Sequence, residues 1–158
     1  MTATKKSKIA MVMSCIAAGL AAITCLAATV GLVGDAKTTK SVNAFEYTRG
    51  AINESGKVIE SNEHLVTKND YTVDGMSIEI DEDSATISYK VAFYDADGEF
   101  ISVTEEQVEN FDVENIPETA KTFKVVITPN YVDGEAVKIN ALNQYKYINQ
   151  LKITYSRE

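Results

Sequence analysis

The chain is short, apolar near its beginning and acidic through the rest. Its 158 residues allow one domain of ordinary size and an anchor. Residues 35–158 hold all 23 acidic residues but only 12 of the 15 basic ones, a net charge of about −11. Nucleic-acid binding requires cationic side chains that displace counterions from phosphates, so we expect no nucleic-acid partner.

Both cysteines, Cys15 and Cys25, lie within the apolar run of residues 9–33. The rest of the chain therefore has no thiol for a disulfide, a thiolate metal site or a cysteine nucleophile. Small secreted eukaryotic domains usually carry disulfides, so their absence favours a bacterial cell-surface protein. The folded part must be stabilised by the burial of apolar surface, which a chain of this length allows.

The apolar run is long enough to cross a membrane. As a helix its 25 residues span ~37 Å, more than the ~30 Å hydrocarbon core of a bilayer. Lysines precede the run and Asp35 follows it, so the positive-inside rule places the N-terminus in the cytoplasm. We interpret the chain as a cytoplasmic tip (1–8), a transmembrane or signal helix (9–34), a polar linker (35–44) and an extracytoplasmic domain (45–158).

The sequence leaves open whether the apolar segment is retained. The segment is longer than the ~7–15 residues typical of a signal-peptide core, which favours a single-pass membrane anchor with the domain outside the cell. Small residues at 34–36 and 42–44 nevertheless offer cleavage positions, and cleavage would release a secreted domain. Both interpretations place the domain outside the cytoplasm.

The domain shows the apolar–polar alternation of strands with one face on a core. Turn sequences that contain glycine occur at 53–56, 95–98 and 132–134. Several strands joined by short turns favour an all-β antiparallel sandwich or barrel over βαβ units. Only residues 104–110 and 140–147 are compatible with a helical turn. The alternating runs are 76–80, 87–93, 100–104, 123–128 and 151–155.

A series of different short motifs lies along residues 48–155: TRG at 48–50, NESGK at 53–57, DYTV at 70–73, VAFYD at 91–95 and GEFIS at 98–102. Residues 111–127 complete the layout. It resembles the β-sandwich modules of Gram-positive surface proteins and of phage tail and receptor-binding proteins, which are similar to jelly-roll carbohydrate-binding modules. The resemblance implies an antiparallel jelly-roll β-sandwich and a carbohydrate ligand.

Few residues of the chain suggest catalysis. The single histidine, His64, lies in a polar stretch that predicts a solvated loop, and no Gly-x-Ser-x-Gly elbow is present. Residues 95–99 begin like a calcium loop but lack its later ligands, so they predict a hairpin turn. Acidic clusters at 79–83 and 105–109 are typical of solvated turns. We therefore expect no enzymatic activity, no metal and no cofactor.

Tyrosines are the best candidates for ligand contact, because an aromatic ring packs on a sugar and its hydroxyl adds a polar handle. Alternation places Tyr94 and Lys90 on the strand face opposite Tyr89, and Lys124 is expected on a neighbouring strand. The alternative is that these are the outward residues of a half-exposed sheet. The predicted binding residues are Arg49, Lys90, Tyr94 and Lys124 on one sheet face, and Tyr145 and Tyr147 at its rim.

Two functions remain open at this level. The leading hypothesis is a membrane-tethered or secreted extracellular binding or adhesion module for a glycan or another surface polymer. The alternative is a structural or assembly subunit that adds its sheet to a larger surface-protein complex and binds no small ligand.

Overall fold

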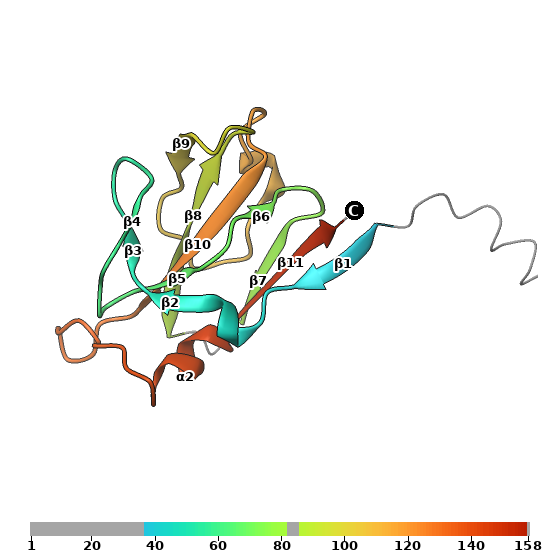
Figure 1. Ribbon diagram of the computed structural model, residues 1–158. Helices are drawn as coiled ribbons and strands as arrows, with labels where there is room; N and C mark the ends of the chain where they lie inside the picture. The colour runs from blue at the N-terminus through green and yellow to red at the C-terminus, as the bar shows by residue number, and fades with distance from the viewer. Residues whose placement is uncertain (1–36, 82–85, 158) are drawn as a thin grey trace, which may run out of the picture. The chain divides into compact units, whose positions relative to one another are not determined.

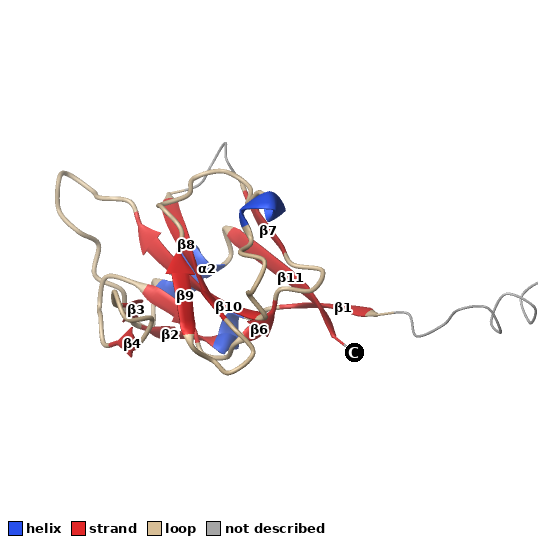
Figure 2. Cartoon of the chain, turned by 90° about the horizontal axis from the view of Figure 1, so that it is seen from above, coloured by secondary structure: helices blue, strands red, loops and turns tan. Residues whose placement is uncertain are grey.

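The computed structural model describes residues 37–81 and 86–157 (Figure 1). Within these ranges almost all regular structure is antiparallel strand, with only short helical turns (Figure 2), so the prediction of an all-β domain is confirmed. The helical turns are η1 (Ala44–Glu46), η2 (Val113–Asn115) and α2 (Gln144–Ile148).

The strands form two main sheets and a separate hairpin. The three-stranded sheet has the order β1 (Thr38–Ser41), β11 (Leu151–Arg157), β7 (Ser77–Ile80). The six-stranded sheet has the order β2 (Tyr47–Arg49), β5 (Leu65–Thr67), β10 (Thr122–Pro129), β8 (Ile87–Tyr94), β9 (Phe100–Val103), with β6 (Tyr71–Thr72) also paired to β10. The hairpin consists of β3 (Ala51–Ile52) and β4 (Val58–Ile59).

The pair β8–β10 is the centre of the six-stranded sheet. Its eight-residue register runs from Thr122 opposite Tyr94 to Pro129 opposite Ile87. Alternate residues of a strand point to the same face, so one face of this pair carries a continuous apolar row. The row is fully buried and consists of Tyr89, Val91, Phe93, Phe123, Val125 and Ile127.

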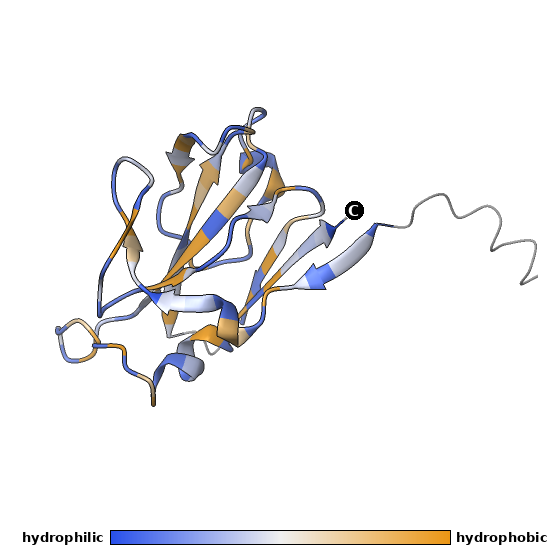
Figure 3. Ribbon diagram, in the orientation of Figure 1, coloured by the Kyte–Doolittle hydropathy of each residue, from blue (hydrophilic) through white to orange (hydrophobic). Residues whose placement is uncertain are grey.

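Both sheets contribute to a single hydrophobic core. Ile78 and Ile80 of β7 and Ile153 of β11 belong to the same buried cluster as the apolar row of β8 and β10. Figure 3 shows apolar residues concentrated along these strands. Burying one large apolar side chain contributes roughly 1.5–3 kcal/mol, so this cluster is the main source of stability in a domain without cysteine.

The predicted turns are present, and each uses a glycine in the left-handed region. The φ angles are 77° at Gly56, 79° at Gly98 and 82° at Gly134. The Asp95 carboxylate accepts backbone N–H bonds from Asp97 and Glu99, each at 2.9 Å. The hairpin turn predicted for residues 95–99 is therefore present, and the Asp95 side chain stabilises it.

Several elements differ from their sequence-based assignments. Residues 104–107 continue along β8 as extended chain, because Gln107 pairs with Tyr89 in a β-bridge, so a helical turn there is wrong. Residues 38–41 fall in the predicted linker, but they form β1 and pair with β11. The helical turn expected within 140–147 is present as α2.

The second face of the six-stranded sheet is covered over its middle, where the sequence suggested a half-exposed surface. Ser88, Ala92, Tyr94, Lys124 and Val126 point to this face and are all buried. The β3–β4 hairpin packs on this face: a Cβ atom added at the preceding residue, Gly50, would lie 2.9 Å from the Ile59 carbonyl oxygen and 3.1 Å from Val66 Cγ1. We call this surface the outer face.

No helix among residues 37–81 and 86–157 is both long and apolar enough to span a bilayer. The sequence predicts the transmembrane or signal helix at residues 9–34, and residues 82–83 of the acidic cluster at 79–83 belong to the stretch 82–85. Both stretches lie outside the described residues.

Candidate functional site

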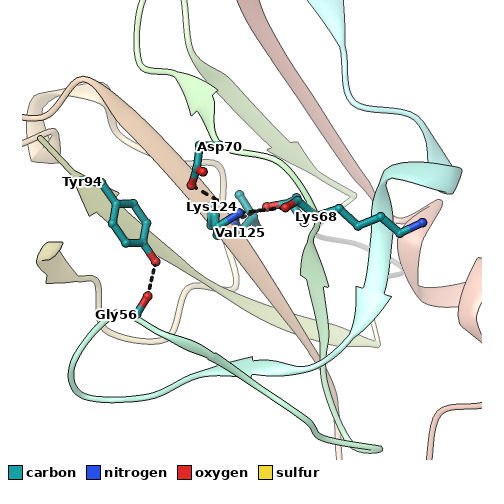
Figure 4. Close-up of polar contacts among 7 residues, drawn as sticks. Gly56, Lys68, Asp70, Tyr94, Lys124 and Val125 are labelled. Carbon is teal, nitrogen blue, oxygen red and sulfur yellow. Dashed lines mark hydrogen bonds and ion pairs between the residues drawn. The ribbon is translucent and has the colours of Figure 1, made fainter. Parts of the chain in front are cut away.

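Tyr94 and Lys124, two of the predicted ligand-binding residues, are engaged in contacts within the protein (Figure 4). The Tyr94 hydroxyl donates to the Gly56 carbonyl oxygen at 2.7 Å, which ties the tip of the β3–β4 hairpin to β8. Lys124 Nζ donates to the Lys68 carbonyl oxygen at 3.0 Å and lies 3.2 Å from the Asp70 carboxylate. Tyr94 is 7% exposed and Lys124 is 9% exposed, so neither forms an open platform for a sugar.

The environment of Tyr94 keeps its phenol protonated. Burial raises the pKa of Tyr94 to about 12, and the negative charge of Asp70 acts in the same direction. A neutral hydroxyl that already donates to a backbone carbonyl stabilises the hairpin and has no donor left for a ligand.

Lys90 lies elsewhere on the outer face, in a pocket with other polar side chains. We call this the His64 pocket. His64 precedes β5, Lys90 lies on β8, and Glu106 follows β9 beside β8. The pocket is lined by Ala51, Ile52, His64, Lys90, Val103, Glu106, Val126, Thr128 and Tyr131.

His64 is half-buried and oriented by a local contact, so the prediction of a solvated loop histidine is only partly right. Its Nδ1 atom lies 2.9 Å from Ser61 Oγ. Burial lowers the pKa of His64, and the positive charge of Lys90 lowers it further, while Glu63 and Glu106 oppose the shift. His64 is therefore neutral at pH 7, and its ring can donate or accept a hydrogen bond.

The charged groups of the His64 pocket differ in their partners. Glu106 accepts a hydrogen bond from the Ser88 hydroxyl, which anchors its carboxylate to β8. None of the ion pairs among the described residues includes Lys90. A half-buried ammonium without a carboxylate partner can interact with hydroxyl or anionic groups of a ligand.

An exposed aromatic ring borders this polar group. Tyr131 follows β10, lines the His64 pocket and is 70% exposed. Val103 and Val126 add apolar walls to the same pocket. A pocket lined by both polar side chains and an accessible aromatic residue suits a ligand with hydroxyl groups and an apolar face.

The structure separates the other predicted binding residues from this pocket. Arg49 is exposed and lines a shallow depression with Thr48, Glu60, Ser61 and Asn62. Tyr145 lies on α2 and forms an edge-to-face contact with exposed Phe45, with ring centroids 6.4 Å apart. Tyr147 is also on α2 but is 6% exposed and belongs to the core.

No group of three or more histidine, cysteine, aspartate or glutamate side chains suited to a metal ion occurs within the part of the chain that the structure describes. Ser61 and His64 are close, but they belong to one local turn, in which Ser61 Oγ also accepts the Glu63 backbone N–H. This arrangement lacks the orienting carboxylate of a catalytic triad.

Sequence reasoning identified Lys90 but missed its neighbours. Tyr131 follows a strand-ending proline, and Glu106 lies in a segment that predicts a solvated cluster, so neither had a local signal for binding.

Comparisons with protein-family models, with curated proteins and with solved structures return no match.

Proposed function

We propose that the chain is an extracytoplasmic binding module of the jelly-roll β-sandwich type, held at a membrane by residues 9–34, that binds a glycan or another hydroxyl-rich surface polymer in the His64 pocket. The observation that carries the proposal is that the exposed Tyr131 and the half-buried Lys90 line the same pocket of the outer face. The proposal includes no catalytic step.

The fold supports a binding role. Two antiparallel sheets that share one core provide a rigid frame, and β8 and β10 present Lys90 and Thr128 from its most extensively paired strands. Side chains on paired strands are better positioned for recognition than side chains on free loops. Binding by such a frame requires little ordering of the protein, which reduces the entropic cost of association.

The chemistry of the pocket supports a polyhydroxylated ligand. Tyr131 offers its ring to the apolar face of a sugar, while Lys90 and His64 supply hydrogen-bond donors. Glu106 can accept from ligand hydroxyls with its remaining carboxylate positions. This proposal replaces the predicted contribution of Tyr94, Lys124 and Tyr147, whose side chains are buried.

A second candidate, the assembly subunit, is favoured by a different observation. Phe45, Leu142 and Tyr145 are large apolar side chains with exposures of 76%, 94% and 38%, and the Phe45 and Tyr145 rings contact each other. Exposed apolar groups of this kind are typical of protein–protein contacts.

A binding assay with matched variants tests the first candidate. We would screen the full-length protein in detergent micelles against a glycan array and insoluble cell-wall polysaccharides. Tyr131→Ala and Lys90→Gln should each weaken binding by about tenfold, a loss of about 1.4 kcal/mol. Tyr145→Ala, which removes an exposed ring outside the pocket, should leave binding unchanged.

The two candidates give opposite results in this assay. Glycan binding would be rejected in favour of assembly if the protein binds no glycan and co-purifies with a protein partner. That partner should be lost in a Phe45→Ala, Tyr145→Ala double variant. Glycan binding that survives both Tyr131→Ala and Lys90→Gln would show that the His64 pocket is the wrong site.

A further inference from the structure

Residues 37–44, which the sequence places in a linker, belong to the folded domain. The four residues of β1, Thr38–Ser41, pair one by one with residues 154–157 of β11 (Figure 1). The pairing continues beyond the strand, because the Val42 N–H donates to the Ile153 carbonyl oxygen at 3.0 Å. β11 therefore has a partner on each side, with β1 on one and β7 on the other.

The residues that follow β1 are held by the core and by a helix cap. Val42 and Ala44 are half-buried and pack against the hydrophobic core. Between them, Asn43 begins η1 with a capping box: its side chain accepts the Phe45 N–H at 3.0 Å, and its own N–H donates to the Glu46 carboxylate at 2.8 Å. The peptide bond between Ala44 and Phe45 therefore lies inside a hydrogen-bonded turn.

These contacts distinguish the two cleavage positions that the sequence offers. A cut after Ala44 would remove β1, two side chains that pack on the core and the N-cap of η1. Buried Ile153 would lose the hydrogen-bond donor to its carbonyl group, and an unsatisfied buried carbonyl is costly. β11 would also become an unprotected edge strand, which is a typical site of aggregation. A cut after Ala36 would remove none of these contacts, because the pairing begins at Thr38.

From these contacts we infer that residues 37–44 are a structural part of the mature domain, and that any proteolytic release of the domain takes place before Lys37. The inference rests on the export that the proposed function assigns to residues 9–34, but it does not depend on the ligand of the His64 pocket. It also shortens the predicted linker from residues 35–44 to residues 35–37.

The N-terminus of the exported protein tests this inference directly. We would express the full-length chain in a Gram-positive host and recover the protein from the membrane fraction and from the medium. N-terminal sequencing and intact mass then identify its first residue. That residue should be Lys37 or lie before it, whether the domain is released or stays anchored. A mature protein that begins at Phe45, or at any other position after Lys37, would overturn the inference.

A pair of proline variants tests whether the domain needs β1 for its stability. The bond from Val42 to β11 fixes the alternation of the antiparallel ladder, so the Lys40 N–H points toward β11 and the Thr39 N–H points away from it. Lys40→Pro removes a ladder hydrogen bond, whereas Thr39→Pro changes the outer edge of the sheet, where proline is tolerated. In the full-length protein in detergent micelles, Lys40→Pro should lower the melting temperature by about 5 °C or more, and Thr39→Pro by less than about 2 °C.

Lys40→Ala is the second control, because it removes the exposed side chain and keeps the backbone N–H; it should melt like the wild type. A Lys40→Pro variant that melts no lower than Thr39→Pro or Lys40→Ala would show that the pairing of β1 contributes nothing, and would overturn the inference. Neither the first residue nor the melting temperature depends on glycan binding, so a failure here is distinguishable from a failure of the proposed function.

Discussion

Replacing Tyr94 by phenylalanine tests whether this residue is structural. The substitution keeps the ring, which packs edge-to-face on Phe100 with centroids 5.9 Å apart, and removes only the hydroxyl. That hydroxyl donates to the carbonyl oxygen of buried Gly56 at 2.7 Å. The change therefore removes one hydrogen bond between β8 and the tip of the β3–β4 hairpin.

The size of the effect follows from burial on both sides of this bond. A typical intramolecular hydrogen bond contributes about 1 kcal/mol, and an unsatisfied buried carbonyl costs about 1–3 kcal/mol. We expect Tyr94→Phe to lower the free energy of unfolding by about 1–2 kcal/mol and the melting temperature by about 3–10 °C. A ligand-binding role alone would predict weaker binding with unchanged stability.

The pH dependence gives a second readout of the same bond. The pKa of Tyr94 rises from 10.0 to about 12 on folding, so the folded state favours the protonated phenol. Its contribution to stability is complete below pH 10 and is lost as the pH rises from 10 to about 12. The stability difference between wild type and Tyr94→Phe should therefore shrink over this range.

Near-ultraviolet circular dichroism of the tyrosines, recorded on the full-length protein in detergent during thermal and urea unfolding, measures both effects. Tyr145→Phe, at an exposed position, serves as the control and should change the melting temperature by less than about 1 °C. A Tyr94→Phe variant with wild-type stability and an unchanged alkaline profile would refute the assignment.

Three further changes test other parts of the fold. In urea unfolding, Gly56→Ala should destabilise the protein by about 1–3 kcal/mol more than Gly98→Ala. Both glycines have positive φ, but only at Gly56 would the new Cβ atom lie 2.4 Å from Phe100. Equal losses of stability would argue against this packing. Phe123→Ala should cost about 3–5 kcal/mol by leaving a cavity in the core, and a loss below about 1 kcal/mol would contradict the buried position of Phe123. Folding lowers the pKa of His64, so its neutral form contributes fully to stability above pH 6.5, and this contribution falls as the pH drops below 6.5. His64→Gln should remove that fall. A stability difference between wild type and variant that stays constant from pH 7 to pH 5 would contradict the pKa shift.

The parts of the fold that could be predicted are those with a long enough pattern. β8 and β10 have eight residues each, so alternation identified both the strands and their core-facing side chains. Strands such as β3 and β6 have two residues and carry no period. β1 has four fully exposed residues, Thr38–Ser41, whose polar composition is equally typical of a linker.

The candidate site could be predicted only in part. Alternation correctly placed Lys90 and Tyr94 on one face of β8, because that depends on the direction of each side chain within the strand. It could not show that the β3–β4 hairpin covers Tyr94 while Lys90 stays open to a pocket. That difference arises from contacts such as the bond from Tyr94 to Gly56, between residues far apart in the chain.

Composition and local pattern were sufficient for the acidic charge of residues 35–158, the confinement of both cysteines to the apolar segment, the long strands and the glycine turns. These properties depend on residue type and on neighbours within a few positions. Which face of a sheet is covered and which carboxylates are paired depended on the tertiary structure. His64, Lys90, Glu106 and Tyr131 form one pocket only because distant strands pair and their connections pack on the outer face.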